Sequence, residues 1–300
     1  MGKIAFVFSG QGDQFPGMGK DLYENYQAAR KIYDLCDGIR PGTSSQCFDG
    51  TENELRETGN TQPCLFATEL AAACVLMTEG IAPDTAAGFS LGEVTAAAVS
   101  GVFDYETGFR LVCKRGELMQ KEAVKFDTSM AAVLRLRPEE VEKVCRNYSD
   151  IYPVNFNCPG QITVSGLSSQ MTDFIAEVKA AGGKAIPLKV KGAFHSPFMN
   201  EAAKAFAGEL ANVKMGRQSS IPLYSNMTAE PYGEDAAGLL SAQICHPVQW
   251  EKTVRNMIAD GADTFIEIGP GRTLTNMIRK ISTEVRAVSV FDYLKEAEGC

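Results

Sequence analysis

The sequence is poor in the residues from which metal sites and disulfide frameworks are built. It contains only two histidines, His195 and His246, and its nine cysteines include no Cys-x-x-Cys pair. A zinc site needs closely spaced Cys or His ligands, so the sequence gives little support for one. Several cysteines lie in apolar stretches, where cysteine behaves as a small hydrophobic residue. We therefore expect free thiols, no metal and no cofactor.

Long apolar runs and an excess of basic residues are also absent. No uninterrupted hydrophobic segment reaches the roughly 20 residues needed to cross a bilayer, and the chain starts on a strand pattern rather than a signal-peptide layout. The formal net charge of −8 disfavours nucleic acid or an anionic membrane as the main partner. We expect a reduced, cytoplasmic, soluble protein that binds neither membrane nor nucleic acid.

Residues 84–101 contain the clearest chemical signal. Small apolar residues lead into Gly88-Phe89-Ser90-Leu91-Gly92, and an Ala-rich helical segment follows. A strand, a tight glycine-flanked turn and a helix are typical of a nucleophile elbow. Ser90 would project from the end of the sheet, and the Leu91 N–H would start a helix whose positive end faces the same place. The alternative is a chance G-x-S-x-G in a chain rich in Ala and Gly.

The rest of the chain follows an α/β pattern. Residues 3–8 are apolar after the first residue, as expected for a parallel strand buried on both faces. Residues 37–60 are predicted to be irregular. Further strands are predicted at 221–225, 264–268 and 287–290, with helices at 21–36, 62–79, 104–121, 235–244, 250–260 and from about 272 to 280.

Residues 129–189 form a separate pattern of strands and helices. Strands are predicted at 130–136, 152–157, 161–165 and 184–189, with helices at 138–146 and 168–181. The order β-α-β-β-α-β is the ferredoxin-like one. We therefore expect a large α/β-hydrolase-like domain with a mostly parallel sheet (residues 1–125 and 192–300) and an inserted ferredoxin-like small domain (residues 126–191).

Two further residues, Arg115 and His195, are candidates for the site because of where they lie in the sequence. Arg115 lies at the centre of the apolar face of the helix predicted at 104–121, and a lone buried charge is very costly. It must pair with a carboxylate of the protein or with a ligand carboxylate, for which its planar fork is suited. His195 precedes a proline-started helix and, with His246, is one of two histidines available as a base for Ser90.

With these pieces in place, the sequence resembles malonyl-CoA:acyl carrier protein transacylases, the discrete acyltransferases of fatty-acid synthesis. The resemblance spans nearly the whole chain, and its motifs occur in the family's order. They are Phe8–Gly12, Thr61–Pro63, Gly88–Glu93, Arg115–Met119, Asn155–Gln161, Ala193–Pro197, Tyr224–Asn226, Pro247–Trp250 and Glu267–Gly271.

The resemblance implies a function and a set of site residues. A malonyl group would pass from malonyl-CoA to Ser90 as an ester, and then to the phosphopantetheine thiol of acyl carrier protein. The implied roles are nucleophile for Ser90, general base for His195, oxyanion-hole N–H donors for Gln11 and Leu91, malonate carboxylate binding for Arg115, and cleft lining for Gln249 and Asn157. A backbone carbonyl near Gln249 would orient His195, and Phe194 resembles the form associated with malonyl selection. Relatives suggest a monomer.

Some residues depart from the family pattern, and the partner is open. Phe89 stands where many relatives have histidine, Asp13 where they have a small residue, and Arg135 and Arg137 add charge. An acidic carrier protein would need a local basic patch, because opposite charges guide such encounters. The candidates are Lys184, Lys189, Lys191, Arg272, Arg279 and Lys280. The alternatives in function are a trans-acting acyltransferase of a polyketide synthase, a serine hydrolase and a non-catalytic scaffold.

Overall fold

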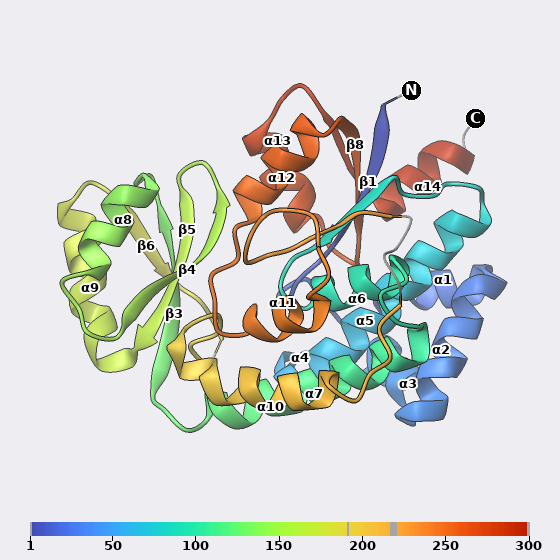
Figure 1. Ribbon diagram of the computed structural model, residues 1–300, viewed down its shortest axis with the longest axis horizontal. Helices are drawn as coiled ribbons and strands as arrows, with labels where there is room; N and C mark the ends of the chain where they lie inside the picture. The colour runs from blue at the N-terminus through green and yellow to red at the C-terminus, as the bar shows by residue number, and fades with distance from the viewer. Residues whose placement is uncertain (1, 191, 217–220, 299–300) are drawn as a thin grey trace.

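The computed structural model describes residues 2–190, 192–216 and 221–298, and the chain folds around two separate β-sheets (Figure 1). The larger sheet has the strand order β7-β2-β1-β8-β9, and every pairing in it is parallel. Its strands are β1 (Lys3–Phe8), β2 (Thr85–Gly88), β7 (Leu223–Tyr224), β8 (Ala262–Ile268) and β9 (Arg286–Ser289). The expected α/β fold with a parallel sheet is confirmed.

Both faces of the parallel sheet are covered, which explains why β1 is continuously apolar. Phe6 and Phe8 pack into one core, while Ala5 and Val7 pack into a second core with Trp250. Successive strand residues point to opposite faces, so each face of β1 needs its own apolar residues.

The helices of this part are α1 (Lys20–Asn25), α2 (Gln27–Ile39), α3 (Thr43–Asp49), α4 (Glu52–Arg56), α5 (Thr58–Thr78), α6 (Gly92–Val99), α7 (Tyr105–Ala123), α10 (Asn200–Leu210), α11 (Ala236–Ala242), α12 (Trp250–Ala259), α13 (Thr273–Ile281) and α14 (Val290–Glu298), with a short 3-10 turn η1 (Pro197–Met199).

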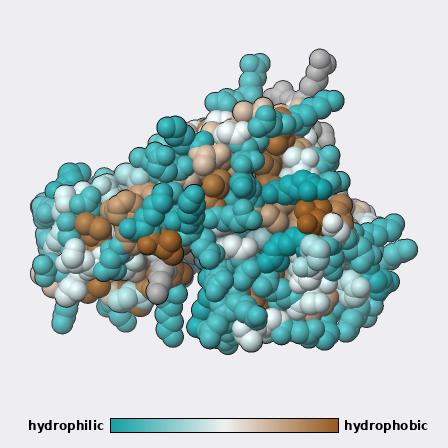
Figure 2. All heavy atoms as spheres, turned by 90° about the horizontal axis from the view of Figure 1, so that it is seen from below, coloured by the Kyte–Doolittle hydropathy of each residue, from teal (hydrophilic) through white to brown (hydrophobic). Residues whose placement is uncertain are grey.

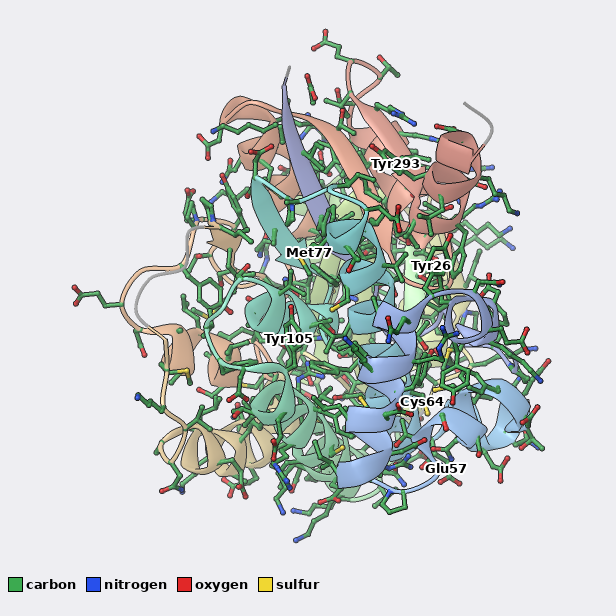
Figure 3. All side chains as sticks on the ribbon, turned by 90° about the vertical axis from the view of Figure 1, so that its right-hand side faces the viewer. Tyr26, Glu57, Cys64, Met77, Tyr105 and Tyr293 are labelled. Carbon is green, nitrogen blue, oxygen red and sulfur yellow. The ribbon has the colours of Figure 1, made fainter. Side chains whose placement is uncertain are left out.

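Helix α5 is the central helix of the first core. In Figure 3 the labels Glu57, Cys64 and Met77 mark its course. Among the described residues it is the one helix long and apolar enough to cross a membrane by length and composition, but 83% of its most apolar window is buried inside the protein. An apolar helix surrounded by other elements of the same chain is a core helix.

The second sheet is antiparallel and has a hydrophobic core of its own. Its elements are β3 (Thr128–Leu134), α8 (Pro138–Cys145), β4 (Ile151–Cys158), β5 (Gln161–Leu167), α9 (Ser168–Ala180) and β6 (Lys184–Pro187), in the strand order β4-β5-β3-β6. Val141, Phe174 and Val178 pack from the two helices onto strand residues such as Val164. Lys191, one of the predicted docking lysines, lies outside the described residues.

The two sheets are joined through β4. The Val248 N–H donates to the Val154 carbonyl at 2.8 Å, and the Phe156 N–H donates to the Val248 carbonyl at 2.9 Å. This attaches the edge strand of the antiparallel sheet to the segment before α12. Figure 2 shows two lobes on the face seen from below, with hydrophobic side chains gathered near their junction.

The prediction of an irregular segment at residues 37–60 was wrong. It contains α3 and α4, and Thr51 and Glu54 close a capping box at the start of α4. Cys47 of α3 and Leu55 of α4 are buried in the same core as α5. Two other differences are the interruption between α1 and α2 at Tyr26 and the helix α14, which sequence periodicity did not reveal.

Candidate active site

Ser90 lies on a sharp turn between β2 and α6, as the elbow pattern predicts. Its φ of 56° is in the left-handed region, which is unfavourable for a residue with a side chain. A Cβ on Gly88 would lie 1.9 Å from the carbonyl carbon of Gly92, and a Cβ on Gly92 would lie 2.3 Å from the Phe8 oxygen. Both glycines are therefore required by close backbone approach.

Asn226, which follows β7, holds this turn from the side. Its Oδ1 accepts from the Ser90 N–H at 2.7 Å, and its Nδ2 donates to the Gly88 carbonyl at 2.5 Å. The Ser90 N–H is therefore occupied, and the next N–H along the chain is that of Leu91. Asn226 belongs to the family-like motif Tyr224–Asn226, but no role was predicted for it.

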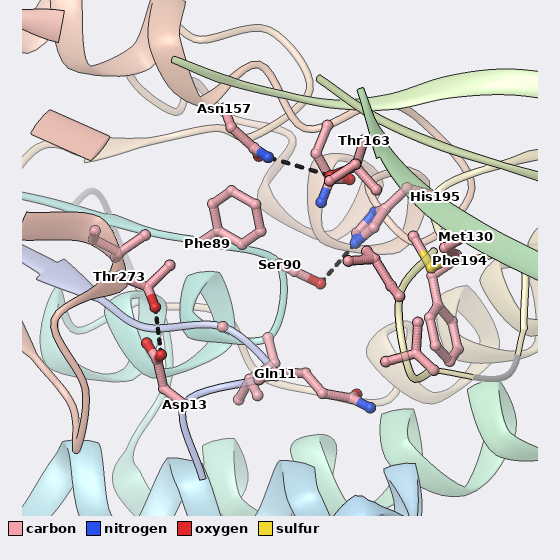
Figure 4. Close-up of a pocket in the computed structure, with 18 of the residues that line it drawn as sticks. Gln11, Asp13, Phe89, Ser90, Met130, Asn157, Thr163, Phe194, His195 and Thr273 are labelled. Carbon is pink, nitrogen blue, oxygen red and sulfur yellow. Dashed lines mark hydrogen bonds between the residues drawn. The ribbon is translucent and has the colours of Figure 1, made fainter. Parts of the chain in front are cut away.

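Ser90 and His195 are brought together from positions 105 residues apart, with 2.7 Å between Oγ and Nε2. Figure 4 shows the two side chains facing each other. On the other side of the ring, Nδ1 lies 2.7 Å from the backbone oxygen of Gln243. A carbonyl oxygen only accepts, so Nδ1 bears the hydrogen and Nε2 is free to accept from the serine hydroxyl.

The carbonyl expected near Gln249 is thus that of Gln243. The Gln249 N–H instead donates to the Asn226 carbonyl at 2.7 Å, and its own carbonyl accepts from Thr253 in α12. Gln249 is the residue before α12 and is not among the residues lining the cavity beside Ser90. The carbonyl that faces the imidazole thus lies six positions before Gln249, in the segment between α11 and α12.

The imidazole of His195 is kept neutral by its surroundings. Its side chain is buried, and burial followed by the nearby Arg115 cation lowers its pKa to about 4, against the raising effect of the Gln243 carbonyl. Removing the ring from water disfavours its charged form. The ring is therefore able to accept a proton throughout the neutral range.

Arg115 is fully buried and is held by neutral groups. Its Nη1 donates to Gln62 Oε1 at 2.9 Å, and its Nη2 donates to Gln243 Oε1 at 2.8 Å and to Ser90 Oγ at 3.3 Å. Within the described part of the chain it makes no salt bridge, and its Nε has no hydrogen-bond partner. Burial lowers its pKa to about 10, so the guanidinium is charged at neutral pH. Of the two partners predicted for Arg115, the direct ion pair with a protein carboxylate is therefore wrong.

Glu93 lies behind the elbow and was not predicted as a site residue. Its Oε1 accepts from the Tyr232 hydroxyl at 2.6 Å and the Asn226 N–H at 3.0 Å, and its Oε2 accepts from Gln243 Nε2 at 2.9 Å. Burial raises its pKa to about 7, although these hydrogen bonds and Arg115 act in the opposite direction. Glu93 is fully buried, and it influences Arg115 without touching it.

A cavity of about 280 Å³ lies between the two sheets, with Ser90 and His195 in its wall. Asn157 and Phe194 both line it (Figure 4). The Nδ2 of Asn157 donates to Thr163 Oγ1 at 3.2 Å, while its buried Oδ1 has no partner. Gln11, Leu91, Gln62, Met119, Met130 and Met277 are among the other lining residues.

The predicted oxyanion donors are available at the cavity wall. Among the described residues, the backbone N–H groups of Gln11 and Leu91 have no protein acceptor, whereas the neighbouring Gly12 N–H donates to Gln14 Oε1 at 2.7 Å. Leu91 lies at the start of α6, where free N–H groups and the helix dipole favour negative charge. These two donors can face an oxyanion formed at Ser90.

Two residues that depart from the family pattern also line the cavity. Phe89 packs edge-on against Trp250, with 5.6 Å between ring centroids. Asp13 accepts from the Thr273 hydroxyl at 2.5 Å, and burial raises its pKa. In the described ranges no group of three or more His, Cys, Asp or Glu residues is arranged to hold a metal ion.

Comparisons with known proteins agree with this geometry. The family model described as "Acyl transferase domain" matches residues 5–295. Malonyl CoA-acyl carrier protein transacylase from Bacillus subtilis (strain 168) is 36% identical, covering 97% of this chain and 94% of that protein. The crystal structure of malonyl CoA-acyl carrier protein transacylase from Clostridium perfringens Atcc 13124 has a TM-score of 0.93 at 32% identity, covering 99% of this chain and 98% of that one.

A further solved structure is of a malonyl-transacylase in complex with a type II PKS acyl-carrier protein. It has a TM-score of 0.93 at 30% identity and covers 98% of this chain and 99% of that one. Fold, elbow and full-length family match define an acyltransferase. More narrowly, the chain belongs to the malonyl CoA-acyl carrier protein transacylase family.

Proposed function

We propose that this protein transfers a malonyl group from malonyl-CoA to the phosphopantetheine thiol of an acyl carrier protein through a malonyl ester on Ser90. The observation that supports this most is the position of Arg115. Its Nη2 lies 3.3 Å from Ser90 Oγ, and no protein carboxylate forms a salt bridge with it in the described chain. A cation beside a nucleophile suits an acyl group with a second, charged end.

In the first half-reaction His195 Nε2 takes the hydroxyl proton as Ser90 Oγ attacks the thioester carbonyl. The N–H groups of Gln11 and Leu91 stabilise the oxyanion. When the carbon–sulfur bond breaks, the imidazolium returns the proton to the CoA sulfur. In the second half-reaction His195 takes the proton of the carrier thiol, the sulfur attacks the ester, and Ser90 Oγ recovers the proton.

In this proposal Arg115 binds the free carboxylate of the malonyl group. Asn157 offers its unpaired Oδ1 to the donor groups of the substrate, and Phe194 limits the space beside the acyl chain. Gln249 has no direct role, because it does not line the cavity. No metal or cofactor takes part in these steps.

The carrier protein is the second partner in the proposal. Of the basic candidates, Lys189 and Lys280 are exposed next to cavity residues. The Nζ of Lys280 donates to Oε1 of the cavity residue Gln161 at 3.5 Å. Arg272 is paired with Asp292, and Arg279 donates to the Ala287 carbonyl. Lys184 is exposed on β6. The carrier of fatty-acid synthesis is our first choice, and the polyketide carrier bound by a relative is the second candidate.

The proposal also covers the finer architecture and setting. The strand order β4-β5-β3-β6 supports a ferredoxin-like description of residues 126–191, and the elbow after a parallel strand supports a hydrolase-like description of residues 1–125 and 192–300. We also infer a monomer. A reduced, cytoplasmic setting is part of the same proposal, and the free thiols of the eight described cysteines support that setting.

Mass spectrometry of the acylated enzyme tests the function. Incubation with malonyl-CoA should add a malonyl mass to the peptide containing Ser90, and a purified carrier protein should then remove it. Ser90→Ala is the matched control and should remain unlabelled. Rapid steady release of free malonate without a carrier protein would instead identify a serine hydrolase.

A further inference from the structure

The side-chain amide of Gln243 connects three parts of the site. Its Oε1 accepts from Arg115 Nη2 at 2.8 Å, while its Nε2 donates to the Ser90 carbonyl at 2.8 Å and to Glu93 Oε2 at 2.9 Å. An amide has an oxygen end that only accepts and a nitrogen end that only donates. Turned by half a rotation, the Gln243 amide would present its NH2 group to the guanidinium, which has only donors.

Glu93 supplies one of the two acceptors that fix this orientation. Its carboxylate is itself held in place, because the Tyr232 hydroxyl and the Asn226 N–H both donate to Oε1. The other oxygen, Oε2, is left facing Gln243. Because Glu93 is fully buried, water cannot replace a missing partner there.

We propose that Glu93 is a positioning residue for substrate recognition: by accepting from Gln243 Nε2 it turns the Gln243 oxygen toward Arg115, which keeps the guanidinium aimed at the acyl carboxylate beside Ser90. The proposal rests on the proposed function and deepens it. Glu93 touches neither the substrate cavity nor the reacting atoms, so it acts through Gln243 and Arg115.

Glu93→Gln separates this role from a simple effect of charge. The Asn226 N–H can only donate, so it keeps the new amide oxygen on its side, and the new NH2 group then meets the NH2 group of Gln243. One of these amides must turn, and if Gln243 turns, two donors meet at Arg115. Loss of a negative charge alone would instead favour an anionic substrate. The two explanations therefore predict opposite changes in malonyl-CoA affinity.

The test compares an anionic substrate with a neutral serine reagent. We expect Glu93→Gln to raise the KM for malonyl-CoA about tenfold or more, the effect of one unsatisfied buried donor. The rate at which Ser90 reacts with phenylmethylsulfonyl fluoride should stay within about twofold, because this reagent needs no cation. Glu69→Gln is the matched control: Glu69 is equally buried, but it accepts from the hydroxyls of Ser9 and Thr95, which can rotate to suit an amide.

A second variant distinguishes the positioning role of Glu93 from a general folding defect. Glu93→Asp keeps the charge but is one methylene too short to reach Gln243 Nε2 while it stays bonded to the Asn226 N–H, so it should show the same selective rise in KM. Equal losses toward malonyl-CoA and the neutral reagent, an unchanged KM, or tighter malonyl-CoA binding would each overturn the role of Glu93. Wild-type enzyme that never acquires a malonyl group would contradict the proposed function itself.

Discussion

The guanidinium of Arg115 lies 3.3 Å from the hydroxyl oxygen of Ser90, and the amide oxygens of Gln62 and Gln243 hold it there. A protein carboxylate in their place would form a buried ion pair and compete with an anionic ligand. Neutral acceptors orient the cation and leave its charge uncompensated at contact distance.

Arg115→Ala should therefore affect acyl groups unequally. We expect malonyl transfer to fall by roughly a hundredfold or more, the range found when one partner of a buried charge pair is removed, and acetyl transfer to be spared. Arg115→Lys should recover only part of the malonyl activity, because an ammonium lacks the planar fork. Initial rates with malonyl-CoA and acetyl-CoA measure the difference, and equal losses for both would refute carboxylate binding by Arg115.

The pKa of His195 predicts an unusually acid-tolerant acylation step. A base is active when deprotonated, and burial with the Arg115 cation places the folded pKa near 4 rather than 6.5. The rate of Ser90 modification by phenylmethylsulfonyl fluoride should thus be flat from pH 8 to about 5.5 and fall only as pH drops through about 4. In Arg115→Ala the rate should begin to fall at a higher pH, because the cation that disfavours protonation of His195 is gone. If the rate for the wild-type enzyme instead fell with a midpoint at pH 6 to 7, burial and the Arg115 cation would not lower the pKa of His195 as expected.

Two glycine substitutions should have opposite effects on stability. Gly92→Ala puts a Cβ 2.3 Å from the Phe8 oxygen, so we expect an unfolded or inactive protein. Gly38 lies within α2 with nothing within 4 Å of a new Cβ, so Gly38→Ala should stabilise the protein by about 0.5–1 kcal/mol. Thermal denaturation of the two variants measures this, and a well-folded, active Gly92→Ala enzyme would show that the elbow tolerates a side chain.

Asn226→Ala should weaken the elbow without touching the cavity. It removes the acceptor of the Ser90 N–H and the donor to the Gly88 carbonyl, and we expect a loss of about 1–3 kcal/mol in the free energy of unfolding. Ser90 acylation should slow as well, because the turn that orients the Ser90 hydroxyl loses both hydrogen bonds from the Asn226 side chain. Asn212→Ala, which removes only an exposed bond to the Gly208 carbonyl, is the control for urea denaturation. Similar stability losses in both variants would contradict a special role for Asn226.

Charge reversal at Lys189 and Lys280 should weaken carrier docking. We expect Lys189→Glu and Lys280→Glu to raise the KM for the carrier protein several-fold, with a smaller effect in high salt, since exposed charges are screened. Lys31→Glu, exposed on α2, serves as the control. Transfer from pre-formed malonyl-enzyme to the carrier isolates this step from CoA binding. An unchanged KM at low salt would place the docking surface elsewhere.

Sequence alone was sufficient where the signal is local. The elbow needs Gly88, Ser90 and Gly92 within five positions, and it forms as predicted. The order of elements in residues 129–189 also follows from periodicity and turn residues, with bounds that differ by a few residues. Residues 37–60 show the limit, because their short helices form by burying residues such as Cys47 and Leu55 beside α5.

The partners inside the site were decided by tertiary structure. Gln243 gives its backbone oxygen to His195, 48 positions away, and its side chain to Arg115 and Glu93, 128 and 150 positions away. Nothing in the neighbouring sequence distinguishes Gln243 from Gln249, near which the family resemblance placed the orienting carbonyl. The sequence determined which residue types form the elbow, the helices and the strands, because those patterns depend on neighbours. Only the packing of two sheets and their loops determined which carbonyl faces the imidazole and which groups surround the guanidinium, because those contacts join residues that are distant in the chain.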